Sequence, residues 1–224
     1  LLDADDMWQT GYIAEVCRLM TYYPDSDCYS TGFDILNNGR RHRATTPHKE
    51  GYINPAEEAN AGCYSVIPSA ATLCRSTILN IGGFPEGMRI GEDQWLWIRM
   101  IQQGAKFCFS PMSLVIYSRT ASNRSASIYR SEVCEHTIAE LYDDSQSDAL
   151  NEYIARTGIG KAITQSVRGG TADARAAIAA FGYTRRHRRQ LRRLKVINTL
   201  PAWLRPTIDG AYSTIAWLIS RRGL

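Results

Sequence analysis

Apolar side chains repeat with two different periods along the chain, and the change divides it into two parts. Short β-prone runs alternate with short helical patterns over residues 1–120, whereas residues 127–194 carry apolar side chains mainly at helical spacing. Strands that alternate with helices are typical of an α/β sheet. The hydrophobic pattern therefore predicts an α/β fold followed by a mainly helical C-terminal extension.

The first elements are a helix, a hairpin and a loop. Tyr12, Val16 and Leu19 lie at helical spacing, so we expect a helix over residues 12–20 that ends before Pro24. The following expected elements are a strand over 28–36, an Asn38-Gly39 turn, a return strand over 40–46 and a loop region over 47–62.

Further along, glycine and proline mark the expected ends of elements. We expect a short buried strand over Ser69–Cys74, a short helix over Arg75–Ile81 and a turn at Gly82-Gly83-Phe84-Pro85. A helix from Glu92 to Gln103, closed by Gly104, should follow. The next expected element is a strand over Phe107–Tyr117 that is interrupted at Pro111. In the helical part we expect breaks at Gly158, Gly160 and Gly169-Gly170.

Composition places the chain among ordinary globular proteins. Its 224 residues are 44% apolar and 21% charged, enough for one large domain and an appendage. Six cysteines are scattered without a C-x-x-C pair, which predicts reduced thiols in a cytosolic protein rather than a disulfide framework.

Charge is distributed unevenly. The chain has a net charge of +4, yet residues 185–224 hold ten basic side chains and one acidic side chain. Such a tail favours a polyanion, and its Trp and Leu residues suit an anionic membrane surface. We therefore expect a basic amphipathic, membrane-surface tail over 185–224; a solvated basic helix and an RNA contact are the alternatives.

Three carboxylates at the start of the chain form the first candidate site. Asp3, Asp5 and Asp6 follow Leu1-Leu2, which we interpret as the end of a strand. Carboxylate oxygens at a strand end suit Mg²⁺ or Mn²⁺, and such an ion can neutralise a departing diphosphate. An acidic turn that caps the next helix is the alternative.

Glu92-Asp93, at the start of a predicted helix, is the second candidate site. A carboxylate beside a cleft can act as a general base toward a hydroxyl group, although an acid in a first helical turn also suits the helix dipole. Trp95, Trp97 and Met100 just after it are expected to be core residues rather than a platform for a sugar.

Together the motifs resemble family 2 glycosyltransferases with the GT-A fold. The resemblance covers residues 1–120 and rests on four segments in the family's order, namely Asp3-Ala4-Asp5-Asp6, Ser69-Ala70-Ala71, Ile81-Gly82-Gly83-Phe84-Pro85-Glu86 and Gly91-Glu92-Asp93-Gln94-Trp95-Leu96-Trp97-Ile98-Arg99. It implies a partial GT-A sheet, Rossmann-like, over residues 1–126. A helical extension over 127–184 and the tail over 185–224 would follow.

The resemblance also implies roles for individual residues. Asp5 would be the main ligand of Mg²⁺ or Mn²⁺, with Asp3 beside it. Asp93 would be the general base, and Glu92 would shape the acceptor pocket. The donor-binding residues would be Asp3, Asp5, Asp6, Ser69, Gly83 and Arg99.

The implied reaction is an inverting sugar transfer. A nucleotide sugar would be the donor and a saccharide or lipid-linked hydroxyl the acceptor, in bacterial polysaccharide biosynthesis at the inner face of the cell membrane. No nucleic-acid partner is expected. In the family about ninety residues precede the first motif and hold the nucleotide base, so we expect the 224-residue chain to be inactive alone.

Two other functions stay open on the sequence. A phosphatase of the haloacid dehalogenase type also begins its chemistry on a strand-end D-x-D, but it expects Thr or Val where Met7 stands. A basic-tailed module that binds membrane or nucleic acid without catalysis would not need Asp5 or Asp93.

Overall fold

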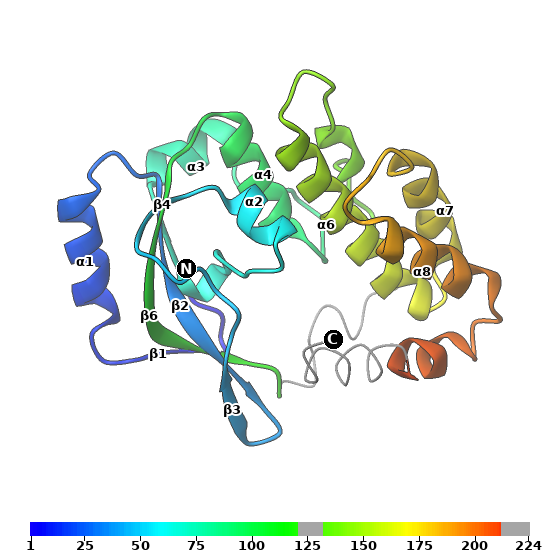
Figure 1. Ribbon diagram of the computed structural model, residues 1–224, viewed down its shortest axis with the longest axis horizontal. Helices are drawn as coiled ribbons and strands as arrows, with labels where there is room; N and C mark the ends of the chain where they lie inside the picture. Colours follow the sequence, from blue (N-terminus) through cyan, green and yellow to red (C-terminus); the bar gives the residue numbers. More distant parts are fainter. Residues whose placement is uncertain (121–131, 212–224) are drawn as a thin grey trace.

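The computed structural model describes residues 1–120 and 132–211 of the chain. Its first half is a mixed sheet with helices on both faces, and its second half is a group of packed helices beside that sheet (Figure 1). The predicted α/β fold with a helical extension is therefore confirmed.

Two long strands form the centre of the sheet. β2 (Cys28–Asn37) and β6 (Phe107–Ser118) run parallel, and the remaining pairs are antiparallel. The main strand order is β1-β6-β2-β3, with β4 paired to β6 and β5 paired to β2. The short strands are β1 (Met7–Trp8), β3 (Arg40–Arg43), β4 (Gly51–Ile53) and β5 (Ala71–Leu73).

Alternation along the central strands separates two cores. Tyr29 and Cys108 pack with α1 (Tyr12–Tyr22) on one face of the sheet. Cys28 and Phe107, one residue earlier on each strand, pack with α4 (Glu92–Gln102) on the other face. This is the period of two that a strand buried on both faces requires.

α4 is buried on two sides. Leu96, Trp97 and Met100 face the sheet, whereas Trp95 and Ile98 join the core of the helical extension. The prediction that the two tryptophans and Met100 are core residues is confirmed, since none is more than 5% exposed. α4 is thus the element through which sheet and extension share a core.

Elements defined by local chemistry match the sequence. Asn38 and Gly39 both have positive φ, 48° and 73°, which is the geometry of a tight two-residue hairpin turn between β2 and β3. α1, α3 (Arg75–Ile81) and α4 lie where the pattern predicts them. The strand predicted over Ser69–Cys74 is shorter, because Ser69 and Ala70 belong to the 3-10 helix η1 (Pro68–Ala70) and β5 begins at Ala71.

The proline in the last strand produces an irregularity rather than an end. β6 continues through Pro111, and its pairing with β2 shifts register on either side of Gly32. A Cβ atom at Gly32 would lie 3.1 Å from the carbonyl oxygens of Pro111 and Met112. Glycine at this position therefore lets the irregular stretch approach β2 closely.

Two expectations in the first half are wrong. Residues 47–62 are not a plain loop, because they contain β4 and α2 (Pro55–Asn60); the Asn54 side chain caps α2 by accepting from the amides of Ala56 and Glu57. Leu1 and Leu2 are not in a strand. The Leu1 amine donates to the carbonyl of Ala71 at 3.1 Å, and one such bond does not make a ladder.

The extension is built around one long helix. α6 (Asp148–Val167) contacts α2, α4, α7 (Thr171–Ala180) and α8 (Arg188–Thr199), and a short 3-10 helix η2 (Ala139–Leu141) precedes it. The expected break at Gly169-Gly170 is confirmed. The breaks expected at Gly158 and Gly160 are wrong, because α6 continues through both residues.

The basic tail begins inside this helical core. Leu191 and Leu194 of α8 are buried in the same cluster as α6, so they do not face a membrane. Residues 205–211 are helical, and most of the apolar run at 211–219 lies outside the described residues. Among the helices described here, none is long and apolar enough to cross a membrane.

Candidate active site

The first acidic motif forms a tight turn anchored to the sheet. The Asp6 amide donates to the Asp3 carbonyl at 3.1 Å, and the Asp3 amide donates to the Ser69 hydroxyl at 3.0 Å. Asp3 and Asp5 are exposed, whereas Asp6 is buried. The fully buried Ser69 thus anchors the turn through the Asp3 amide, while Asp3 and Asp5 remain exposed to solvent.

Asp6 ties the same turn to the end of β6. Its Oδ1 accepts from the Ser118 amide at 2.8 Å, while Oδ2 is buried without a hydrogen bond among the described residues. Burial raises the pKa of Asp6, although the nearby Ser69 hydroxyl and the Ser118 amide oppose the shift. Asp6 is therefore a support of the turn rather than an open ligand.

The second acidic motif opens α4. Gly91 precedes it with φ of 79°, a left-handed conformation that favours glycine. The two oxygens of Asp93 accept from the backbone amide of Gln94 at 2.8 Å and from its side-chain amide at 3.3 Å. Burial raises the pKa of Asp93, and these hydrogen bonds oppose the increase. A carboxyl with a raised pKa is better matched to proton transfer near neutral pH.

The fold brings the two motifs into electrostatic contact. Although Asp3 is exposed as a residue, partial burial of its carboxyl group raises its pKa, and the charges of Asp5 and Asp93 raise that pKa further. Burial likewise raises the pKa of Glu92, with Asp93 and Asp3 adding to the increase and Lys161 opposing it. Carboxylates far apart in the sequence therefore lie close enough to raise each other's pKa.

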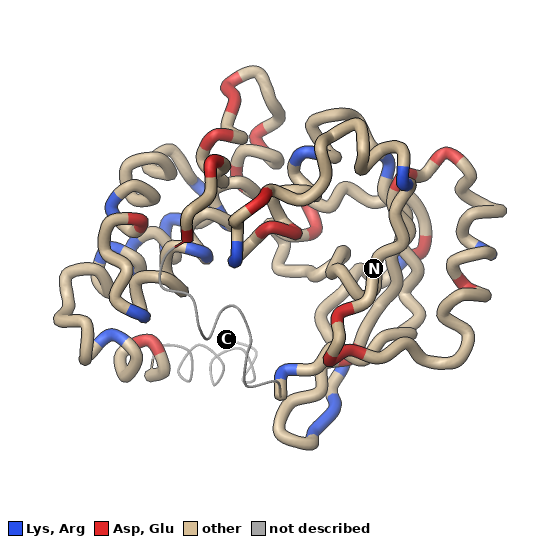
Figure 2. The backbone as a smooth tube through the Cα atoms, turned by 180° about the vertical axis from the view of Figure 1, so that it is seen from behind, with Lys and Arg blue, Asp and Glu red and all other residues tan. Residues whose placement is uncertain are grey.

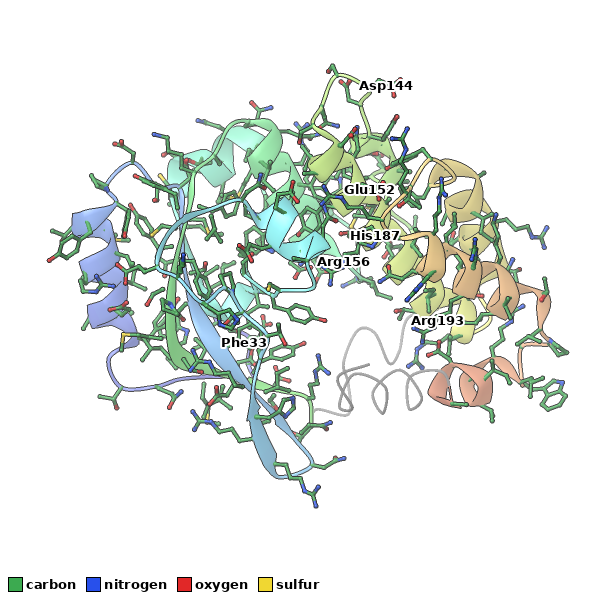
Figure 3. The ribbon with its side chains drawn as sticks, in the orientation of Figure 1. Phe33, Asp144, Glu152, Arg156, His187 and Arg193 are labelled. Carbon is green, nitrogen blue, oxygen red and sulfur yellow. The ribbon has the colours of Figure 1, made fainter. Side chains whose placement is uncertain are left out.

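A pocket of about 300 Å³ lies at the start of α4 and includes Asp93. Its walls come from α2, the segment after α2, the N-terminus of α4 and one side of α6. The wall from the extension carries polar and cationic side chains, namely Tyr153, Arg156, Thr157, Lys161 and Thr164. Figure 3 labels Arg156, which lies where α6 faces α2 and donates to the Ala59 carbonyl. The pocket offers a space for a polar ligand directly beside the candidate base.

Two predicted site residues lie elsewhere. Gly83, in a left-handed turn after α3, and Arg99 line a larger cavity of about 1120 Å³ that does not include Asp93. Arg99 donates to the Gln102 side chain at 3.3 Å, and its guanidinium lies 5.8 Å from the centre of the Trp95 ring. The structure does not bring Gly83 and Arg99 together with the acidic residues.

The donor set around the acidic turn allows only limited metal coordination. Nowhere in residues 1–120 and 132–211 do three or more His, Cys, Asp or Glu side chains gather so that they could hold a metal ion. The exposed carboxylates of Asp3 and Asp5 are hard oxygen donors of the kind that Mg²⁺ and Mn²⁺ prefer. Two such carboxylates are fewer than the ligands of a complete site for either ion.

The sequence did not point to the pocket wall from α6. Tyr153, Arg156 and Lys161 lie about sixty residues beyond Asp93, in a pattern typical of an ordinary helix. Polar and apolar side chains are mixed around α6, which contacts four other helices. The spacing of its apolar residues therefore marks no single functional face. Only the packing of the extension against α4 reveals them.

Part of the chain is similar to known proteins. No protein-family model matches the chain. It is 43% identical over 97 residues to the pre-mycofactocin glycosyltransferases of two Mycobacterium tuberculosis strains, CDC 1551 / Oshkosh and ATCC 25618 / H37Rv. The match covers 43% of this chain and 18% of the length of each relative. The matched stretch of the chain is therefore similar to one part of these glycosyltransferases.

Proposed function

We propose that this protein is a family 2 glycosyltransferase that moves a sugar from a nucleotide-sugar donor to an acceptor hydroxyl. One observation carries the proposal: the acidic turn and the start of α4 influence each other's ionisation beside a pocket that includes Asp93. The similarity to the two mycobacterial glycosyltransferases supports the same class of reaction.

Asp93 is the general base of the proposed reaction. It takes the proton of the acceptor hydroxyl while that oxygen attacks the anomeric carbon of the donor. The bond between this carbon and the diphosphate oxygen breaks, and its electron pair leaves with the diphosphate. A single displacement of this kind inverts the anomeric configuration. Glu92 would act from beside Asp93, whose charge raises the pKa of Glu92, since Glu92 itself does not line the pocket.

The acidic turn would face the diphosphate side of the donor. Asp5 and Asp3 would hold Mg²⁺ or Mn²⁺, and such an ion neutralises charge that develops on the departing diphosphate. Asp6 and Ser69 keep the turn in place through their contacts with β6 and with Asp3. Gly83 and Arg99 remain candidates for a more distant part of the donor or acceptor, since they line the larger cavity.

The acceptor occupies the pocket between α2, α4 and α6. A saccharide or lipid-linked hydroxyl fits its mixture of hydroxyl, cationic and apolar side chains. An anionic membrane surface is the proposed location, since Arg189, Arg192 and Lys195 are exposed along α8 and Trp203 after it is 78% exposed.

The substitution Asp93→Asn tests the proposed base. We expect turnover to fall by about 10² to 10⁴, the range for loss of a general base, with donor binding unchanged. The measurement is release of nucleoside diphosphate from a panel of UDP- and GDP-sugars by the full gene product, with donor affinity from calorimetry.

The matched control is Asp148→Asn. Asp148 is also an acid in the first turn of a helix, α6, but it is exposed and lies outside the Asp93 pocket. If Asp93 were only a helix-start acid, both variants would lose a little stability and keep their turnover. Equal turnover in the two variants therefore contradicts the proposal.

A further inference from the structure

A chain of hydrogen bonds connects the helical extension to Asp93. The hydroxyl of Tyr153, on α6, donates to Oε1 of Gln94 at 2.6 Å. Nε2 of the same Gln94 amide donates to Oδ2 of Asp93 at 3.3 Å. The backbone amide of Gln94 donates to the other oxygen, Oδ1, at 2.8 Å. The carboxylate is thus held at both oxygens, and one contact depends on how the Gln94 side chain is turned.

The Tyr153 hydroxyl fixes the orientation of the Gln94 side-chain amide. A glutamine side chain has one accepting oxygen and one donating amino group, so a donor on its oxygen turns the amino group the other way. Tyr153 is only 4% exposed, and burial raises the pKa of its phenol, so the group stays protonated and acts as a donor. With its oxygen fixed by Tyr153, Gln94 presents its amino group to Asp93.

The position of Tyr153 is itself fixed by packing. It belongs to the core cluster in which α6 meets Trp95 and Ile98 of α4. α6 also contacts α2, α7 and α8, so the phenol is carried by the most connected helix of the extension. A donor anchored in this way can hold a side chain of another element without moving itself.

We propose that Tyr153 is a positioning residue that acts through Gln94 to orient the carboxylate of Asp93 toward the acceptor pocket. The proposal rests on the proposed role of Asp93 as general base. It gives the helical extension a part in the reaction: the sheet half carries the base, and the extension sets its direction.

Other ionisable groups also face Asp93. All the variants compared below retain these groups, apart from the tyrosine that is replaced, so their effect on the pKa of Asp93 is common to the comparison. Asp3 approaches from the acidic turn, and Glu92 precedes Asp93 on α4. Tyr153, Arg156 and Lys161 come from α6 and line the same pocket, as do Cys63 and Tyr64 from the segment after α2.

The test is the pH dependence of kcat/KM for Tyr153→Phe in the full gene product. Without the phenol, the Gln94 amide loses its fixed orientation and with it the hydrogen bond to the Asp93 carboxylate. That bond stabilises the charged form, so its loss raises the pKa of Asp93. The base acts when deprotonated, and the acidic limb of the profile therefore moves to higher pH by about one unit. We expect kcat at the plateau to fall about threefold to tenfold, with KM for the donor within about twofold.

Two further variants separate positioning from packing. Tyr183→Phe removes a similar bond in the extension, because the Tyr183 hydroxyl donates to the Asn151 carbonyl at 2.9 Å without reaching Asp93. We expect its acidic limb to stay in place. Gln94→Met removes the intermediate amide and should move the limb as Tyr153→Phe does; adding Tyr153→Phe to it should move the limb no further.

The outcomes distinguish this inference from the function on which it rests. Full turnover in Asp93→Asn overturns the proposed function. Loss of turnover in Asp93→Asn, with an unmoved limb in both Tyr153→Phe and Gln94→Met, overturns the positioning role alone. The positioning role is also overturned if Tyr183→Phe moves the limb as far as Tyr153→Phe, because the effect would then come from general loosening of the extension.

Discussion

Asp93 and Asp148 illustrate how much the surroundings of one residue decide. Both are acids in the first turn of a helix, where a negative charge is favourable. Asp148 is exposed, whereas Asp93 lines a pocket and burial raises its pKa. Two residues that a sequence pattern treats alike therefore have different chemistry.

A substitution of Asp5 tests the proposed metal site. Asp5→Asn should weaken the binding of UDP in the presence of Mn²⁺ by about tenfold or more, because an amide is a neutral and poorer ligand than a carboxylate. Calorimetric titration of UDP, with Mn²⁺ and with EDTA, measures the effect.

The control for this prediction is Asp25→Asn. Asp25 is an exposed acid that lies 3.7 Å from the Lys106 ammonium group, and it is not part of the acidic turn. Its affinity for UDP should not change. Unchanged binding in Asp5→Asn, or binding that EDTA does not reduce, would remove Asp5 from the donor site.

At the scale of elements, two glycines of α6, Gly158 and Gly160, have different surroundings. A Cβ atom at Gly158 would lie 2.1 Å from the buried ring of Phe181, so α6 can pack against that ring only because the side chain is absent. A Cβ atom at Gly160 would meet nothing within 4 Å. The helix continues through both because packing on four sides outweighs the weak helix propensity of glycine.

The two glycines give a matched pair of stability predictions. Gly158→Ala should lower the free energy of unfolding by about 1–3 kcal/mol, because the new methyl group overpacks the core. Gly160→Ala should raise it by up to about 1 kcal/mol, because alanine is the better helix former. Urea unfolding followed by circular dichroism measures both. Stabilisation by both substitutions would mean that Phe181 does not pack against α6 in this way.

The whole molecule has an uneven charge distribution. Basic residues recur along the helices of the extension and also on the β2–β3 hairpin, whereas acidic residues lie on both halves, including the N-terminal segment beside the sheet (Figure 2). In the tail, Arg186 and Arg193 form ion pairs with Glu57 and Asp209. Arg189, Arg192 and Lys195 are exposed on α8, whereas three of its apolar side chains, Leu191, Leu194 and Ile197, are buried and Val196 alone is exposed. What α8 offers a membrane is therefore charge rather than an apolar face.

The proposed membrane contact predicts charge-dependent binding to vesicles. The triple variant R189Q/R192Q/K195Q should bind vesicles containing phosphatidylserine about a hundredfold more weakly, since each basic residue contributes about 1 kcal/mol near an anionic surface. Vesicles of phosphatidylcholine alone should bind neither protein. Co-sedimentation at two salt concentrations gives the affinities, and higher salt should weaken the binding.

A second triple variant removes the same charge elsewhere. R40Q/K49Q/R75Q changes three exposed basic residues outside the extension. Equal loss in the two variants would indicate a response to net charge rather than a surface on α8. Tighter binding of the unmodified protein to duplex RNA than to the anionic vesicles would favour the nucleic-acid alternative.

The sequence predicted well those parts of the fold that depend on neighbouring residues. The hairpin at Asn38-Gly39 follows from the turn chemistry of those two residues, and α1 follows from a clear apolar stripe. α2 was missed because glycines and prolines dominate its surroundings and its cap, Asn54, precedes only six helical residues. The breaks predicted at Gly158 and Gly160 were wrong because packing against other helices stabilises α6.

For the site, the sequence alone determined which chemical groups are available: carboxylates at the start of the chain and at the start of α4. Tertiary structure decided the rest. It brought Asp3 within electrostatic reach of Asp93, separated both from Gly83 and Arg99, and placed Tyr153 behind Gln94. The physical reason is that a periodic pattern shows which side of an element is apolar, whereas the partner that covers that side is chosen only when distant segments pack together.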